Sequence, residues 1–155
     1  MIRVQGTPFD PGAEIKSFLG RNPNSGGIAT FIGQVRDFQS VQNSSSSEVT
    51  SLELEHYPGM TEKMLTEIEQ DAHRRWNLDA TLIIHRYGTL DPGEEIVMVA
   101  CAAAHRGDAL ESCTFLIDWL KTKAPFWKCE DTEDGEKWVS ARDSDTEAAK
   151  RWEED

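Results

Sequence analysis

The sequence predicts an α+β domain in which helices pack on a mixed β-sheet. Stretches rich in β-branched and aromatic residues alternate with stretches whose apolar residues recur at helical spacing. Two further strand-like stretches flank an Asp134-Gly135 pair, which indicates an antiparallel hairpin. The length of 155 residues suits one domain, so residues 1–155 are expected to form a single unit.

The first predicted strand spans residues 28–36 (IATFIGQVR), where β-branched and aromatic residues are concentrated. Residues 39–51 are polar and Ser-rich, so we expect a mobile loop there, inside the domain. A strand-like stretch, residues 51–57, follows at once, and Pro58-Gly59 then indicates a turn.

A helix is predicted next, with Thr61 as its cap and an end near Trp76. Its expected apolar face has helical spacing and consists of Met64, Leu65, Ile68, Ala72 and Trp76. Two strands follow at residues 81–87 and 95–104, separated by the turn signal Asp91-Pro92-Gly93.

The second long helix is expected to open at Gly107-Asp108, with Asp108 as its cap. Pro125 prevents this helix from continuing much past Thr122. Its predicted buried stripe consists of Leu110, Cys113, Leu116, Ile117 and Leu120. The hairpin strands are predicted at residues 126–131 and 136–140, and the last helix at residues 144–152.

The composition excludes several classes of function. The net charge of −12 disfavours a general nucleic-acid binder, because phosphates would be repelled. No apolar run is long enough to span a bilayer, and the first residues lack the apolar core of a signal peptide. Three cysteines without close pairing suggest reduced thiols and a cytoplasmic protein.

The cysteines and histidines do not predict a metal site. The four histidines are scattered without ligand spacing, so a zinc site is not expected. Cys101 and Cys113 lie in apolar patterns and are interpreted as core residues. Cys129 follows Lys128, so its thiol is expected to be more exposed, with the ammonium favouring the thiolate.

The charge is unevenly distributed along the chain. Residues 130–155 contain eleven acidic and four basic side chains, whereas residues 105–128 contain four basic and three acidic ones. A local basic cluster in an acidic protein is typical of a focused anion site. The alternative is that these lysines merely end a helix and keep it soluble.

Two groups of basic residues form the candidate anion site. Arg36 ends a predicted strand, and His105-Arg106 lies where another strand gives way to a helix N-terminus, a common place for anions. Taken singly, Arg36 also fits a solvated strand end and His105 a hydrogen-bonded core residue. Lys121 and Lys128 flank the Pro125 break, and a chain reversal there would bring their ammonium groups together. Crowded lysines can serve as nucleophile, proton shuttle or anion clamp.

Several blocks of the sequence resemble the catalytic (large) subunit family of molybdopterin synthase. They extend in one order over residues 27–152 and include the following stretches: residues 33–36 (GQVR), 54–63 (LEHYPGMTEK), 84–93 (IHRYGTLDPG), 105–106 (HR), 120–128 (LKTKAPFWK) and 148–152 (AAKRW). The combination of LEHYPGM and LKTKAPFWK is specific for this family. Residues 39–51 form a longer loop than is usual in it, and Cys129 stands where the family often has a basic residue.

The resemblance implies an α/β hammerhead-type fold and a cytoplasmic sulfurtransferase of molybdenum cofactor biosynthesis. Its substrate would be cyclic pyranopterin monophosphate, which receives two sulfurs to form the dithiolene of molybdopterin. The sulfur donor would be the C-terminal thiocarboxylate of a small ubiquitin-like carrier subunit. The catalytic subunits of the family form a central homodimer within a heterotetramer.

The resemblance also implies roles for individual residues. Lys121 and Lys128 match the family's catalytic lysines. The implied substrate-binding residues are Gln34, Val35, Arg36, His105, Arg106, Cys129, Glu130 and Arg142, of which Arg142 would reach the pocket across the dimer. A non-catalytic module that binds a ubiquitin-like tail is the alternative. A phosphate-ester or nucleotide-processing enzyme is less well supported, because no glycine-rich phosphate loop or acidic metal motif occurs.

Overall fold

The computed structural model describes residues 1–35, 49–132, 135–139 and 143–153, and it confirms the predicted α+β class. Its elements in chain order are β1 (Ile2–Gln5), α1 (Pro11–Arg21), β2 (Gly27–Gln34), β3 (Val49–His56), α2 (Met60–Arg75), β4 (Leu78–Arg86), β5 (Gly88–Leu90), β6 (Glu95–Ala103), α3 (Arg106–Thr122), β7 (Phe126–Thr132), β8 (Gly135–Val139) and α4 (Asp143–Lys150). Within the described ranges, no helix is long and apolar enough to cross a membrane.

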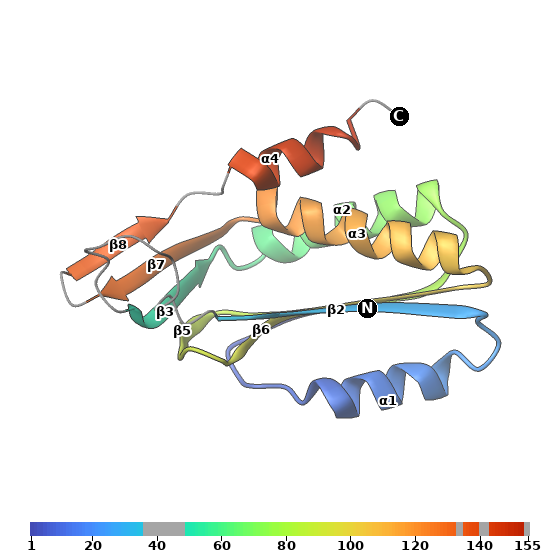
Figure 1. Ribbon diagram of the computed structural model, residues 1–155, viewed down its shortest axis with the longest axis horizontal. Coiled ribbons are helices and arrows are strands. Elements are labelled where there is room, and N and C mark those ends of the chain that lie inside the picture. Colours follow the sequence, from blue (N-terminus) through green and yellow to red (C-terminus); the bar gives the residue numbers. More distant parts are fainter. Residues whose placement is uncertain (36–48, 133–134, 140–142, 154–155) are drawn as a thin grey trace.

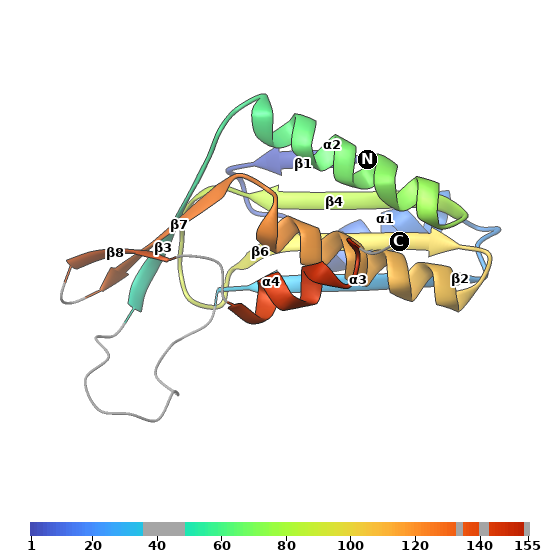
Figure 2. The same cartoon turned by 90° about the horizontal axis from the view of Figure 1, so that it is seen from above.

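The strands form two four-stranded sheets, and the second sheet lies beyond one end of the first (Figures 1 and 2). The first sheet has the order β1-β4-β6-β2 and is mixed, because β1 pairs with β4 in parallel while the other pairs are antiparallel. The second sheet has the order β5-β3-β7-β8 and is antiparallel throughout. The predicted mixed sheet and the predicted hairpin, β7–β8, are therefore both confirmed.

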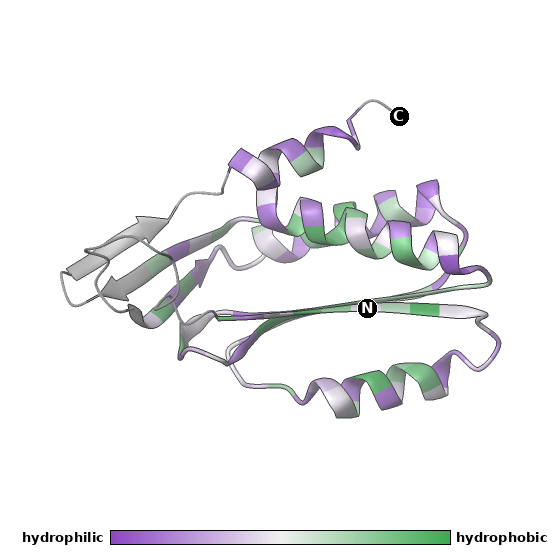
Figure 3. Cartoon of the chain, viewed as in Figure 1, coloured by the Kyte–Doolittle hydropathy of each residue, from purple (hydrophilic) through white to green (hydrophobic). Residues whose placement is uncertain are grey.

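Helices cover both faces of the first sheet. Helices α2 and α3 lie on one face, α1 lies on the other, and α4 rests on α3 (Figure 1). The strands of this sheet are predominantly hydrophobic, whereas the helices alternate hydrophobic and hydrophilic residues (Figure 3). This is the pattern expected of a buried sheet covered by amphipathic helices.

The strand alternation of β4 divides the core between these two faces. Leu82 and Ile84 point to the α1 side and pack with Phe18. Ile83 points to the other side and belongs to the larger cluster that contains Leu65 of α2 and Phe115 of α3. The second sheet has a smaller cluster, formed by Val35, Leu52, Leu54 and Leu90.

The start of α2 differs from the prediction. Gly59, with a φ of 81°, is the N-cap, and its N–H donates to the Glu62 carboxylate at 2.6 Å. Thr61 is not the cap: it is fully buried, and its hydroxyl bonds both the N–H and the carbonyl of Tyr57. Glycine suits this position because other residues rarely adopt a positive φ.

The start of α3 also differs from the prediction. The helix begins at Arg106 with His105 as its N-cap, so Asp108 lies in the first turn rather than at the cap. Leu110 is 58% exposed and does not belong to the buried stripe. Successive helical residues point about 100° apart, and the buried face runs through Ala109 and Cys113, which turns Leu110 outward.

Three elements were not predicted from the sequence: β1, α1 and β5. The boundary of the predicted loop was also wrong at its end, because β3 already begins at Val49. The other residues of the predicted loop, 39–48, lie outside the described residues.

Candidate functional site

The end of β2 holds two of the predicted binding residues, Gln34 and Val35. The Val35 N–H donates to the Glu94 carbonyl at 2.9 Å, and the Gly93 N–H donates to the Val35 carbonyl at 2.8 Å. The Gln34 side-chain amide donates to the Gly93 carbonyl at 3.2 Å. Val35 is buried, whereas Gln34 is exposed. Of these two residues, only Gln34 has a side chain that a ligand can contact. Arg36 lies outside the described residues.

The turn that holds Gln34 and Val35 is itself fixed by a buried arginine. Arg86 is 4% exposed, and its Nη1 donates to Glu94 Oε1 and to the Glu95 carbonyl, both at 3.1 Å. Glu94 Oε2 also accepts the N–H of Asp91 at 2.7 Å. This backbone hydrogen bond, followed by the one from Arg86, lowers the pKa of Glu94. Sequence reasoning did not single out Arg86 or Glu94.

Lys121 lies in the last turn of α3. Its Nζ is 3.3 Å from Asp145 Oδ1 of α4, and both side chains are partly exposed. The C-terminal turn of a helix favours a cation, so the position alone does not require a function. The ion pair is exposed enough for an anionic ligand to compete with Asp145.

Lys128 lies on β7, opposite Leu54 of β3 and Val139 of β8. Its side chain is exposed. The prediction that the chain reverses at Pro125 is wrong, because β7 continues from the end of α3 away from the helices (Figure 1). The helix ends as expected at Thr122, but the extended strand that follows carries Lys128 into the second sheet.

Cys129 is buried, with 5% of its surface exposed, so the expectation of an exposed thiol is wrong. Consecutive strand residues point to opposite faces, which turns Cys129 away from the face that carries Lys128. Glu130 pairs through its backbone with Leu52; its side chain and Arg142 lie outside what the structure describes.

The two other cysteines are core residues, as predicted. Cys101 of β6 and Cys113 of α3 belong to one buried cluster. A hydrogen bond between the two thiols, together with burial, raises the pKa of Cys101. A thiol held in its neutral form in this way is a poor nucleophile.

His105 and Arg106 lie at the opposite end of α3 from Lys121. Helix α3 has 17 residues, so its ends are roughly 25 Å apart. Arg106 instead adjoins the start of β2, where a Cβ added to Gly27 would come within 3.1 Å of its Cα. The ends of β2 and α3, which carry Gln34 and Lys121, and the start of β7 therefore lie towards one end of the molecule, and the start of α3 lies at the other (Figure 2).

Two histidines that sequence reasoning treated only as scattered residues gather near Lys128. The His85 ring stacks on Phe126 with 3.6 Å between ring centroids and 14° between planes. His56 lies 6.3 Å from the same Phe126 ring. All three rings lie in blocks that carry the family resemblance: His56 in residues 54–63, His85 in residues 84–93 and Phe126 in residues 120–128.

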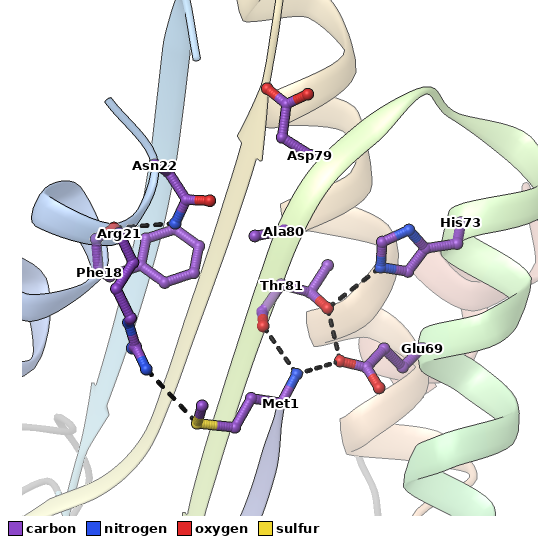
Figure 4. Close-up of a pocket in the computed structure, with 9 residues that line it drawn as sticks. All are labelled: Met1, Phe18, Arg21, Asn22, Glu69, His73, Asp79, Ala80 and Thr81. Atoms are coloured by element: carbon purple, nitrogen blue, oxygen red, sulfur yellow. Dashed lines mark hydrogen bonds and ion pairs between the residues drawn. The ribbon is translucent and has the colours of Figure 1, made fainter. Parts of the chain in front are cut away.

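A separate hollow of about 430 Å³ lies between α1, α2 and β4 (Figure 4). Glu69 Oε1 accepts hydrogen bonds from the N-terminal amino group of Met1 at 2.6 Å and from the Thr81 hydroxyl at 2.5 Å. His73 Nε2 lies 3.3 Å from that hydroxyl. None of the predicted site residues that the structure describes lines it. Among the described residues, no group of three or more His, Cys, Asp or Glu side chains is arranged to hold a metal ion.

Comparison with known proteins gives consistent matches over most of the chain. Residues 4–123 match the family model described as MoaE protein. The molybdopterin synthase catalytic subunit of Pseudomonas aeruginosa is 51% identical over 153 residues, which is 99% of each chain.

Solved structures also match over most of the chain. The molybdopterin biosynthesis MoaE protein from Burkholderia ambifaria has a TM-score of 0.81 and 50% identity, and the match covers 99% of this chain and 97% of that one. Molybdopterin synthase from Staphylococcus aureus has a TM-score of 0.77 and 28% identity over 89% of this chain and 96% of that one.

Proposed function

This chain belongs to the MoaE protein family, and on that premise we propose that it is the catalytic subunit of a molybdopterin synthase. It transfers sulfur from the C-terminal thiocarboxylate of a small ubiquitin-like carrier subunit to cyclic pyranopterin monophosphate. The product is the dithiolene of molybdopterin. We further propose that residues 1–155 act as one catalytic domain in the cytoplasm.

The observation that carries this proposal is that the elements bearing Gln34, Lys121 and Lys128 reach the same end of the first sheet (Figure 2). The exposed Gln34 amide ends β2, Lys121 ends α3, and Lys128 follows on β7, at the junction of the two sheets. Two lysines and an amide suit the two anionic reactants, a cyclic phosphate and a thiocarboxylate. The chain as a whole is acidic, so anions are expected to bind only where basic side chains are grouped, as at this junction.

The location of His105 and Arg106 supports a site shared between two copies of the chain. These residues are roughly 25 Å from Lys121 along α3, too far for one small substrate to contact both ends. A two-fold dimer can bring the α3 N-terminus of one copy to the lysines of the other. We therefore propose that one copy supplies Lys121 and Lys128, and that the second supplies His105 and Arg106. Arg36, Glu130 and Arg142 remain predicted binding residues.

The chemistry requires the chain to bind anions and stabilise developing negative charge. The thiocarboxylate sulfur attacks a carbon of the pterin side chain and forms a C–S bond as a C–O bond at that carbon breaks, and the departing oxygen keeps the electron pair and takes up a proton. The carrier stays attached through its acyl carbon. Water then attacks that acyl carbon, and the acyl C–S bond breaks to give the carrier's carboxylate and a thiolate on the pterin. A second thiocarboxylated carrier repeats these steps. Lys121 and Lys128 stabilise the anionic intermediates by charge.

Replacement of Lys121 by Ala tests the assignment. With thiocarboxylated carrier in excess, we expect dithiolene formation to fall by about a hundredfold or more. Lys16→Ala, an exposed lysine on α1, is the matched control and should retain wild-type turnover. Near-normal turnover of a folded Lys121→Ala protein would contradict the assignment.

Titration with the pterin precursor separates the synthase from a module that only binds a ubiquitin-like tail. The synthase is expected to bind both the precursor and the carrier. A binding module would take up the carrier and leave the cyclic phosphate in solution, and this outcome would overturn the proposed function.

A further inference from the structure

His85 is a buried polar residue near the end of β4. It is 7% exposed and follows Ile83 on the face of the first sheet that α2 and α3 cover. Its backbone lies in register with Val4 of β1 and Val97 of β6. The row of apolar residues along this face therefore ends in an imidazole, at the point where the second sheet begins.

One hydrogen bond determines the tautomer of His85. Its Nδ1 lies 2.8 Å from the carbonyl oxygen of Arg86. A carbonyl oxygen only accepts hydrogen bonds, so Nδ1 carries the proton and donates it. In the neutral ring, Nε2 is then unprotonated and has a lone pair available as an acceptor.

The stack with Phe126 brings this ring under the face of β7 that carries Lys128. Phe126 and Lys128 are two residues apart on one strand, so their side chains point to the same face and are spaced about 7 Å apart. The centroid distance of 3.6 Å between Phe126 and His85 therefore puts the imidazole against the side chain that neighbours Lys128 on this face of β7. The positive charge of Lys128 is one of the causes that lower the pKa of His85, after burial.

His85 stays uncharged in this environment. The pKa of His85 is lowered to about 4, mainly because the ring is buried. The hydrogen bond to Arg86 raises this pKa, and the charges of Lys128 on β7 and His56 on β3 lower it further. A neutral imidazole does not repel the Lys128 ammonium and can accept a hydrogen bond from it.

We infer that His85 is a positioning residue for Lys128: its Nε2 accepts a hydrogen bond from the Lys128 ammonium and holds that charge towards the anionic substrate. This inference rests on the proposed function, in which Lys128 is an active-site lysine. The other role open to His85 is purely structural, as a core residue that supports Phe126. The two roles predict different kinetics.

Three substitutions separate these roles. His85→Gln keeps an acceptor oxygen near the position of Nε2, whereas His85→Asn keeps only the donor near Nδ1, and His85→Phe keeps neither. We expect kcat to fall about tenfold or more in the Asn and Phe variants, while KM for the pterin precursor changes less than about twofold. The Gln variant is expected to retain kcat within about threefold. His73→Asn, an exposed histidine on α2, is the matched control with wild-type kinetics.

The pH profile gives a readout that a structural role would not change. An acceptor for the ammonium favours the charged lysine. The alkaline limb of kcat is therefore expected to shift to lower pH in His85→Asn and to stay in place in His85→Gln. If His85→Asn fails to fold, the Gln variant still decides, because a shifted limb in that folded variant would overturn the inference.

A double-mutant cycle shows whether His85 acts through Lys128. Lys128→Ala and Lys128→Ala/His85→Asn are expected to have the same residual turnover within about twofold. A further tenfold loss in the double variant, or a wild-type kcat in folded His85→Asn, would overturn the inference. Wild-type turnover of Lys128→Ala would instead contradict the proposed role of Lys128, so the two failures are distinguishable.

Discussion

The two sheets differ in how deeply their side chains are buried. The first is covered on both faces, and the clusters on its two sides contain fully buried residues such as Ile83, Ile84 and Phe115. The side chains that are described in the second sheet contribute to one small cluster, and its strand β7 carries an exposed Trp127 and an exposed Lys128. Apolar burial is the main source of folding free energy, so the first sheet should dominate stability.

The candidate site lies where the buried sheet meets the exposed one. Strand β4 ends there in His85 and Arg86, and β2 ends in Gln34. A rigid, buried strand fixes the position of a side chain at its end, while the exposed neighbouring strand leaves room for a ligand. The comparison therefore predicts that substitutions in the first sheet's core change stability, and that those at the junction change turnover.

The largest effect on stability is expected from Phe115→Ala. Phe115 is fully buried, and its ring lies 5.2 Å from that of Trp76 and 5.5 Å from that of Trp152. Its removal should lower the free energy of unfolding by about 3–5 kcal/mol, measured by urea denaturation. The protein that remains folded should keep wild-type kcat. Tyr57→Ala, which removes a 61% exposed ring, is the control and should cost less than about 0.5 kcal/mol. A Phe115→Ala variant with normal stability would contradict the idea that the core of the first sheet dominates stability.

The shared site is tested by mixing two inactive variants. Lys128→Ala and Arg106→Ala should each lose about a hundredfold in turnover, with little change in unfolding free energy because both side chains are exposed. Unfolding and refolding them together produces mixed dimers in which one of the two sites is intact. The mixture should then recover about a quarter of the wild-type rate. No recovery, despite dimers of both chains detected by native mass spectrometry, would indicate that each site is formed within one chain.

Asp118→Asn tests how α4 is held against α3. Asp118 Oδ2 accepts from Arg151 Nη2 at 2.5 Å and from Trp152 Nε1 at 2.8 Å. Loss of the carboxylate charge should cost about 1–3 kcal/mol, at the lower end because half of Arg151 is exposed. The effect is local if the substitution speeds amide hydrogen exchange in α4 relative to wild type and leaves exchange in α2 unchanged. Glu147→Gln, in an exposed pair with Lys150, is the control and should leave exchange unchanged.

The sequence predicted those elements whose periodicity is long or whose turn chemistry is strong. The helices over residues 61–76 and 108–122 and the Asp134-Gly135 hairpin have such signals. Strand β1 has four residues, too few for a period, and it becomes a strand because it pairs with β4. Helix α1 did carry a signal, since Asp10 caps it and Pro11 begins it.

The candidate site was less predictable than the fold. The charge pattern and the resemblance both singled out Lys121 and Lys128, but only the structure shows that β7 leads away from α3. The stack of His85 on Phe126 joins two residues 41 positions apart, on strands of different sheets. Contacts of this kind depend on how the sheets meet, which no local pattern encodes.

The smallest effect is expected at Glu94, and it depends on pH. The Asp91 N–H and the Arg86 guanidinium lower the pKa of Glu94 from its ordinary value of 4.5. A carboxyl group with a lowered pKa in the folded state stabilises the protein above its unfolded-state pKa, and this contribution is lost as the pH falls through the folded value. Glu94→Gln should therefore lower the Tm slightly at pH 7, and the difference from wild type should disappear as the pH falls below 4.5. Glu67→Gln, an exposed glutamate on α2, should show little difference at either pH. A Glu94→Gln difference that stays constant down to pH 3 would mean that Arg86 is held by its bond to the Glu95 carbonyl, and that the junction does not need the Glu94 charge.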